Sequence, residues 1–151
     1  MIGRMKLPRP AHAASLLATA LLALATTAAA QTLERASLRL PGYEVPVEIA
    51  RPAGAGPFPP VLYIHAKRGF EDEDRAHLRE LAAQGFLVVA PDWQAGNMIE
   101  RWPDRHHPQT EADVEAALDA LRARSDVCRG PVGIVALSRG PYYAIRIAAR
   151  R

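Results

Sequence analysis

The chain has 151 residues, with 19 lysines and arginines against 16 aspartates and glutamates, which gives a formal net charge of +3 at pH 7. Arg4, Lys6 and Arg9 account for that excess, so the sequence after residue 30 is neutral, and its net charge gives no support for nucleic-acid binding, which requires a basic face. Cys128 is the only cysteine, which excludes an intrachain disulfide.

The first 30 residues have the composition of a secretory signal peptide. Basic residues precede the uncharged segment "AHAASLLATALLALATTAAA", and Ala28-Ala29-Ala30 provides an A-x-A cleavage site before Gln31. Such a run is also long enough to span a bilayer, but its alanine and threonine content and the cleavage site favour removal on export. We therefore expect residues 1–30 to be a signal peptide and residues 31–151 a single domain. The mature protein would be periplasmic or secreted, without membrane attachment.

Several runs of the mature sequence have the pattern of β-strands. Two β-rich runs flank Pro41-Gly42 in "ASLRLPGYEVPVEIARP", which predicts a hairpin. The runs "PVLYIH" (60–65), "FLVVAPD" (86–92) and "VGIVAL" (132–137) are short and continuously apolar, as in strands that are buried on both faces.

Helical spacing of apolar residues separates these strands. "RAHLRELAAQG" predicts a helix that Asp74 caps and Gly85 ends, and a second helix is expected from about residue 111 to residue 124. "YYAIRIAARR" predicts the start of a third helix after the last strand. The alternation of strand and helix predicts an α/β fold, a mostly parallel sheet with flanking helices and right-handed crossovers.

Ser138 lies between the last predicted strand and the third predicted helix. Ala136 and Gly140 stand two positions away on either side, which gives small-x-Ser-x-Gly, a nucleophile-elbow pattern with alanine in place of the first glycine. Small neighbours are needed there because the backbone is crowded and the hydroxyl must project from a sharp turn. The alternative is that Ser138 only caps the third helix.

With this elbow between strand and helix, the chain resembles the α/β-hydrolase superfamily and, within it, the dienelactone hydrolase family. The resemblance runs from about residue 33 to the last residue and rests on "PVLYIHAKRG", "LAAQGFLVVAPDW" and "PVGIVALSRG". It implies an α/β-hydrolase-type sheet in which Ser138 attacks a small-molecule ester or lactone and forms an acyl-enzyme. It implies that the backbone N–H of Arg139 and an N–H at Ala66 or Lys67 hold the oxyanion. It implies neither a cofactor nor a metal, and it gives His65 the role of shaping the oxyanion loop.

Three positions depart from what the resemblance implies. Ser138 stands where many family members have cysteine, and Ala66 stands where they have a glutamate. Gly96 is the nearest match to an arginine that would bind a substrate carboxylate. These departures favour ordinary ester chemistry over dienelactone substrates.

The sequence after the elbow does not supply the rest of a catalytic triad. Residues 139–151, "RGPYYAIRIAARR", contain neither an acid nor a histidine, whereas the superfamily order is Ser, then Asp or Glu, then His. We therefore expect an α/β-hydrolase sheet truncated after the nucleophile elbow, from a domain of roughly 200–250 residues. The alternative is a non-catalytic remnant or binding module that keeps the framework, so the sequence leaves open whether this chain is an enzyme.

The polar loop after residue 92 contains further candidates. Trp93, His106 and His107 are candidate substrate-binding residues, because the loop follows a strand end at the edge of the sheet that carries Ser138. One of the histidines, with Asp104 nearby, is also a candidate base in an improvised dyad. A solvated polar loop accounts equally for the two histidines, packing over the sheet edge accounts equally for Trp93, and adjacent histidines rarely bind one metal ion.

Overall fold

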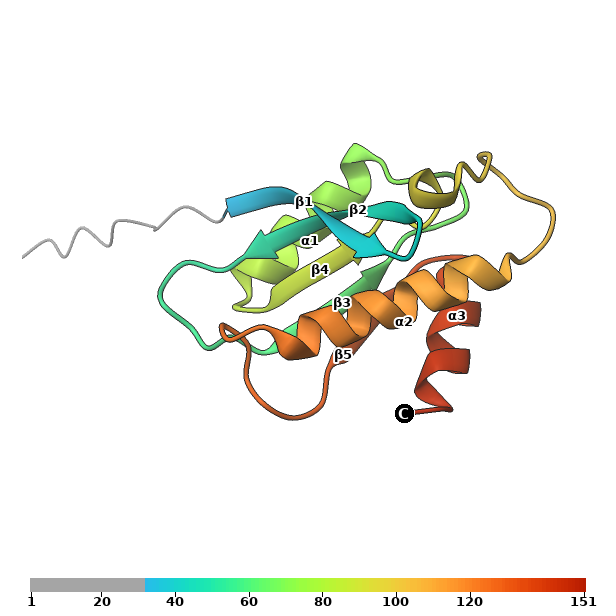
Figure 1. The fold of residues 1–151 in the computed structure, drawn as a ribbon. Helices are drawn as coiled ribbons and strands as arrows, with labels where there is room; N and C mark the ends of the chain where they lie inside the picture. Colours follow the sequence, from blue (N-terminus) through green and yellow to red (C-terminus); the bar gives the residue numbers. More distant parts are fainter. Residues whose placement is uncertain (1–31) are drawn as a thin grey trace, which may run out of the picture.

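The computed structural model describes residues 32–151 (Figure 1), so the signal peptide expected over residues 1–30 lies outside the described residues. The elements are β1 (Thr32–Leu40), β2 (Tyr43–Arg51), β3 (Pro60–Ile64), α1 (Asp72–Ala83), β4 (Leu87–Pro91), the short 3-10 helix η1 (Ala95–Asn97), α2 (Pro108–Ala123), β5 (Gly133–Ala136) and α3 (Gly140–Ala148). Over this part of the chain, no helix combines the length and the apolar character that crossing a membrane would require.

The five strands form one sheet in the order β1-β2-β4-β3-β5. β1 and β2 form the hairpin predicted around Pro41-Gly42, and β2 also pairs antiparallel with β4. β4, β3 and β5 are parallel to one another, because helical crossovers join them. The structure therefore confirms the predicted α/β fold and places an antiparallel hairpin beside the parallel strands.

Helices cover both faces of the central strands, which explains the continuous apolar runs. Every residue of β3 and β4 is buried. α1 covers one face, where Leu78 and Ala82 form an apolar cluster with Tyr63 and Val88. α2 and α3 cover the other face (Figure 1). The cluster on that face includes Leu62, Ile64, Val89, Leu118, Leu121 and Ile147.

Two helix boundaries differ from those predicted. α1 begins after Glu71 in a capping box, in which the Glu71 N–H donates to Asp74 Oδ2 at 2.8 Å. Asp74 thus occupies the third helical position and not the cap itself. α2 begins at Pro108, earlier than the predicted residue 111, because proline is well suited to the first turn of a helix.

The two edges of the sheet differ in chemistry. β1 has charged side chains at exposed positions, among them Glu34, Arg35 and Arg39. β5 has the sequence GIVA, carries no charge, and is only partly buried. Beside β5 lies a groove of about 240 Å³ that Tyr63, His77, Glu80, Leu81, Gln84, Val135 and Leu137 line. β5 is therefore an open, apolar edge strand, as the sequence predicts.

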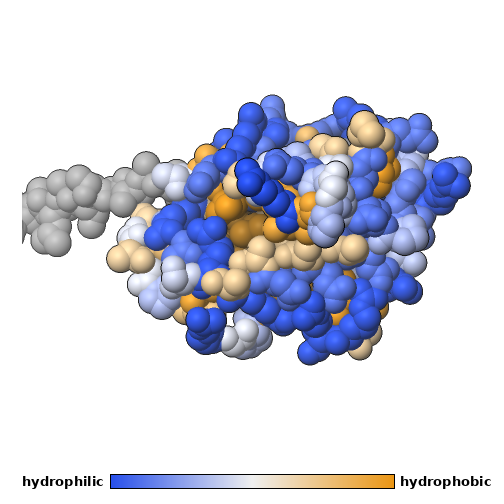
Figure 2. Space-filling view, viewed as in Figure 1, coloured by the Kyte–Doolittle hydropathy of each residue, from blue (hydrophilic) through white to orange (hydrophobic). Residues whose placement is uncertain are grey.

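A hydrophobic hollow is visible on the face that carries α2 (Figure 2). A crevice of about 180 Å³ lies there between the hairpin and α2, and its lining includes Ala36, Leu38, Ile49, Ala117 and Leu121. α2 lies mainly over β3 and β4, so it covers the hairpin only in part.

We expect the purified chain to aggregate through β5, because an unpaired apolar edge strand is a template for pairing with other chains. Val135→Lys should slow aggregation, measured by light scattering, because it places a charge on that edge. Ser37→Lys adds the same charge at an exposed position of the other edge strand and should aggregate at the wild-type rate. A monodisperse wild-type chain, or equal rates for the two variants, would contradict this expectation.

Candidate active site

Ser138 lies at a sharp turn between β5 and α3, where its φ is +52° and its side chain is exposed. The Leu137 N–H donates to Ile64 O at 2.9 Å, and the Gly140 N–H donates to Leu137 O at 2.8 Å, which closes the turn. A left-handed backbone is costly for a residue other than glycine and persists only where the surroundings impose it. The turn thus presents the Ser138 hydroxyl outside the carboxyl end of β5.

Gly140 explains why the elbow needs small neighbours. A Cβ at this position would lie 2.7 Å from Ile64 O and 3.2 Å from Ala136 Cβ. No side chain fits at residue 140, because the first turn of α3 packs directly against the end of β3. Arg139 is the N-cap of α3 and there is no side-chain cap hydrogen bond, so Ser138 does not act as the helix cap.

The backbone at Ser138 generates a prediction about stability. Ser138→Gly should be more stable than Ser138→Ala by about 1 kcal/mol. Glycine avoids the cost of about 1–2 kcal/mol that an L-residue pays in a left-handed conformation, and the larger conformational entropy that glycine loses on folding offsets only part of this gain. Both variants remove the hydroxyl, so urea unfolding of the pair isolates the backbone effect. Ser138→Ala being equally or more stable would show that the turn is not strained.

The loop after β3 is held by hydrogen bonds to its carbonyl groups. Ala66 O lies 2.8 Å from His65 Nδ1 and accepts the Gly69 N–H at 3.3 Å. Lys67 O accepts the Trp102 N–H at 2.8 Å and Gln94 Nε2 at 3.1 Å. Neither the Lys67 nor the Arg139 N–H donates a hydrogen bond within residues 32–151. Both groups are thus available to an external acceptor.

Trp93 is packed in the core and does not take the place of a substrate-binding residue. Its side chain is fully buried, stacks on the His65 ring, and donates from Nε1 to His65 O at 3.3 Å. It therefore packs beneath the loop and does not line an open pocket. Of the two expectations for Trp93, substrate binding and packing, the structure agrees with packing.

Asp92 is ionised beside the buried His65 ring. Burial alone would raise the pKa of Asp92, but the adjacent His65 ring and the Ala95 N–H outweigh burial and hold that pKa below its usual value. The Ala95 N–H donates to Asp92 Oδ1 at 3.1 Å, and His65 Nε2 lies 3.5 Å from the same oxygen.

The segment from Arg105 to His107 lies against the first turns of α3. Arg139 Nη1 donates to Arg105 O at 2.6 Å, and the His107 N–H approaches the Tyr143 hydroxyl at 3.4 Å. The His106 ring stacks on the Tyr142 ring, with centroids 3.5 Å apart and an angle of 13° between the planes. The structure thus brings both predicted histidines to the helix that begins after Ser138.

The electrostatic setting of His106 favours its neutral form. Desolvation, followed by the positive charges of Arg139 and Arg146, lowers the pKa of His106 below its usual value. An imidazole of this kind can accept a proton at pH 7.

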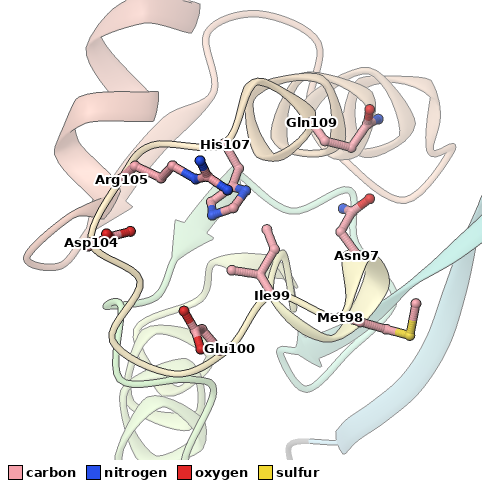
Figure 3. A pocket seen from close by; sticks show the side chains of 8 residues that line it. All are labelled: Asn97, Met98, Ile99, Glu100, Asp104, Arg105, His107 and Gln109. Atoms are coloured by element: carbon pink, nitrogen blue, oxygen red, sulfur yellow. The ribbon is translucent and has the colours of Figure 1, made fainter.

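A polar cavity of about 470 Å³ adjoins this segment (Figure 3). Arg105 and His107 lie side by side on one wall, and Asn97 and Gln109 lie on the opposite side. The remaining lining residues are Met98, Ile99, Glu100 and Asp104. The volume lies within the range of small-molecule sites.

A buried carboxylate that the sequence analysis misses lies next to this cavity. Asp113 accepts the Tyr43 hydroxyl at 2.6 Å and also binds Asn97 Nδ2, and burial raises its pKa. Asp113 lies one helical turn before Ala117 on the buried face of α2, so an acidic residue on an apolar helical face is the signal that could have found it.

Close packing against Val45 explains why residue 96 is a glycine. A Cβ at residue 96 would lie 2.8 Å from Val45 Cγ2 and 3.1 Å from Val45 Cα. η1 packs so closely on β2 that no larger side chain fits there. An arginine at this position is therefore incompatible with the packing of this chain.

Comparison with known proteins decides the family. Residues 45–151, well over half of the chain, match the dienelactone hydrolase family. The chain belongs to the dienelactone hydrolase family. This agrees with the elbow and with the loop after β3, on which the predicted resemblance rests. No curated protein sequence matches the chain.

Solved structures share the fold of this dienelactone hydrolase family member. A protein of Klebsiella pneumoniae subsp. pneumoniae MGH 78578, assigned as a dienelactone hydrolase, has a TM-score of 0.63 and 25% identity over 81% of this chain and 56% of its own. A dienelactone hydrolase-like promiscuous phosphotriesterase from metagenomic libraries has a TM-score of 0.67 and 21% identity, over 80% of this chain and 55% of its own. Esterase Est22 has a TM-score of 0.66 and 17% identity, over 82% and 40%. The chain thus spans about half the length of these proteins, or less.

Proposed function

We propose that this chain carries the nucleophile and the oxyanion hole of a serine hydrolase that acts on small-molecule esters or lactones. The observation that carries the proposal is the exposed Ser138 at a left-handed backbone position between β5 and α3, in a member of the dienelactone hydrolase family. Strained backbone at an exposed nucleophilic residue is typical of active sites.

The oxyanion of the tetrahedral intermediate lies between two backbone donors in this proposal. The Arg139 N–H follows the nucleophile directly, and the Lys67 N–H belongs to the Ala66-Lys67 loop after β3. β3 and β5 pair in parallel with Ile64 opposite Ala136, so the loops that follow them both begin at the carboxyl ends of the strands. A donor of this kind typically contributes 10²–10³-fold to kcat.

The proposed reaction has two steps. The Ser138 Oγ forms a bond to the carbonyl carbon while its proton passes to a base, and the carbonyl electrons move to the oxygen. When the intermediate collapses, the bond to the leaving oxygen breaks and the leaving alcohol takes that proton. Water then repeats the sequence on the acyl-enzyme, which releases the acid and restores the serine.

His106 is the base that we assign to this chain. Its ring stacks on Tyr142, which lies one helical turn after Ser138, and its lowered pKa keeps the proton-accepting form populated at pH 7. Apo structures often show catalytic contacts that tighten only in the substrate complex.

The proposed substrate is a neutral ester or lactone. Gly96 cannot be replaced by the carboxylate-binding arginine that the resemblance implies, because Val45 fills the space. The cavity that we assign to the substrate carries charges of both signs, with Glu100 and Asp104 besides Arg105. A mixed polar lining suits uncharged polar groups better than a substrate anion.

A fluorophosphonate probe tests the proposal by covalent labelling of the folded chain. We expect labelling at Ser138, complete loss in Ser138→Ala, and a rate about 10²-fold lower in His106→Gln, because a general base typically contributes 10²–10⁴-fold. Ser125→Ala is the control, since Ser125 is exposed at the opposite end of β5 and should not affect labelling. Mass spectrometry of the labelled peptide identifies the site.

The outcomes separate the two candidate functions. A folded chain that takes no label contradicts the hydrolase and supports a non-catalytic binding module. Labelling that persists unchanged in His106→Gln leaves Ser138 as the nucleophile and removes His106 as its base.

Export is also part of the proposal. Residues 1–30 would direct the chain out of the cytoplasm and be removed after Ala30. The intact mass of protein recovered from the periplasm or medium should correspond to a chain that begins at Gln31. A full-length mass in the cytoplasmic fraction would contradict export.

A further inference from the structure

Gln94 is a buried polar residue that joins two loops of the candidate site. Its Nε2 donates to Lys67 O at 3.1 Å and to Glu100 O at 2.8 Å. Lys67 belongs to the loop after β3 that carries the proposed oxyanion donor, and Glu100 lines the polar cavity (Figure 3). One amide nitrogen therefore bonds to the backbone of both loops.

The direction of these two bonds follows from the chemistry of the groups. A backbone carbonyl oxygen only accepts, and an amide NH₂ group has two hydrogens, so Nε2 provides one hydrogen for each carbonyl. Gln94 Oε1 is buried and makes no hydrogen bond within residues 32–151. A buried acceptor without a partner lowers the stability of the fold. Departures of this kind from the best local choice are typical of functional sites.

The segment around Gln94 holds its side chain in place. Gln94 O accepts the Ile99 N–H at 2.9 Å, which closes the turn around η1. The preceding residue, Trp93, is fully buried. Only 4% of Gln94 is exposed, so its amide is fixed by packing as well as by its two bonds.

Two other contacts join the same loops. The Trp102 N–H donates to Lys67 O at 2.8 Å, and at the surface Glu71 binds both Arg68 and Arg101. Exposed ion pairs of the second kind contribute little to rigidity in water. The contact through Gln94 differs from both, because it is buried and bonds directly to a residue of the cavity wall.

We propose that Gln94 is a positioning residue that makes the oxyanion loop and the wall of the substrate cavity one rigid unit. This inference rests on the proposed function, because that function gives the Lys67 N–H and the cavity their roles. A substrate that lies against the wall is then held at a fixed position relative to the Lys67 N–H. Such preorganisation lowers the barrier, because the donor need not be oriented during the reaction. Gln94 acts through the two carbonyl groups and does not touch the substrate.

Gln94→Met removes both donor hydrogens and the unpaired oxygen while it keeps a side chain of similar length. Lys67 O retains the Trp102 N–H, so the variant should fold with a melting temperature close to that of the wild type. We expect it to label with the fluorophosphonate probe about 10-fold more slowly, a fraction of what removing an oxyanion donor costs. The loss should appear in the maximal labelling rate and not in the probe concentration at half-maximal rate.

Two further variants accompany this one. Gln84→Met makes the same chemical change at an exposed position at the end of α1 and should label at the wild-type rate. Gln94→Asn has a shorter amide that reaches at most one of the two carbonyls. Its labelling rate should lie between those of the wild type and Gln94→Met.

Hydrogen exchange measured by mass spectrometry provides a readout that does not depend on activity. In Gln94→Met, peptides that cover residues 66–71 and residues 97–102 should both exchange faster, by about 10-fold, because local opening of either loop becomes easier. Peptides of β3 and β4 should keep their wild-type exchange rates. A general loss of stability would accelerate the exchange of these strands as well.

The outcomes distinguish this inference from the proposed function. If the wild-type chain labels and folded Gln94→Met labels equally fast, or if only one of the two loops exchanges faster, the inference about Gln94 is overturned and the hydrolase proposal stands. If the wild-type chain takes no label while both loops exchange faster together in Gln94→Met, the rigid unit stands as geometry and the hydrolase proposal fails.

Discussion

The carbonyl group of Ile64, at the end of β3, is the point on which both halves of the candidate site depend. Its oxygen accepts the Leu137 N–H, and a Cβ on Gly140 would approach it to 2.7 Å. The first turn of α3 can press this closely on β3 only if residue 140 has no side chain. The chain must then turn sharply between Leu137 and Gly140, and Ser138 takes the left-handed backbone that this turn requires.

The same strand end also delivers the loop opposite the serine. His65 and Ala66 follow Ile64 directly, so the position of β3 sets the origin of the oxyanion loop as well as the space for α3. β3 owes that position to its burial between α1 on one face and α2 and α3 on the other. The apolar core therefore places the site, and the hydrogen bonds of the two loops orient it.

Features that depend on neighbouring residues could be predicted from the sequence, and features that depend on distant ones could not. Continuous apolar runs predict β3 and β4 because burial on both faces leaves no alternation, and Ala136 and Gly140 reveal the elbow by their size. For Trp93 the sequence leaves packing and substrate binding open, because its burial depends on stacking with His65, a residue far from it in the sequence. The contact of Asp113 with Tyr43 joins α2 to the hairpin turn, and no local pattern indicates such a pair.

The chain spans 56% or less of three structures that share its fold, yet the groups that form the candidate site are held by contacts within the described residues. The turn at Ser138 is closed by Ile64 and Leu137, and the Ala66-Lys67 loop is held by His65, Gln94 and Trp102. What the described residues leave uncovered is β5, whose outer edge is apolar and unpaired, while the opposite edge strand carries charges. Charged side chains on an edge strand discourage its pairing with other chains, whereas an apolar edge strand favours such pairing. The geometry of the site therefore depends on the side of β5 that pairs with β3, and the solubility of the sheet depends on the other side of β5, which is unpaired among the described residues.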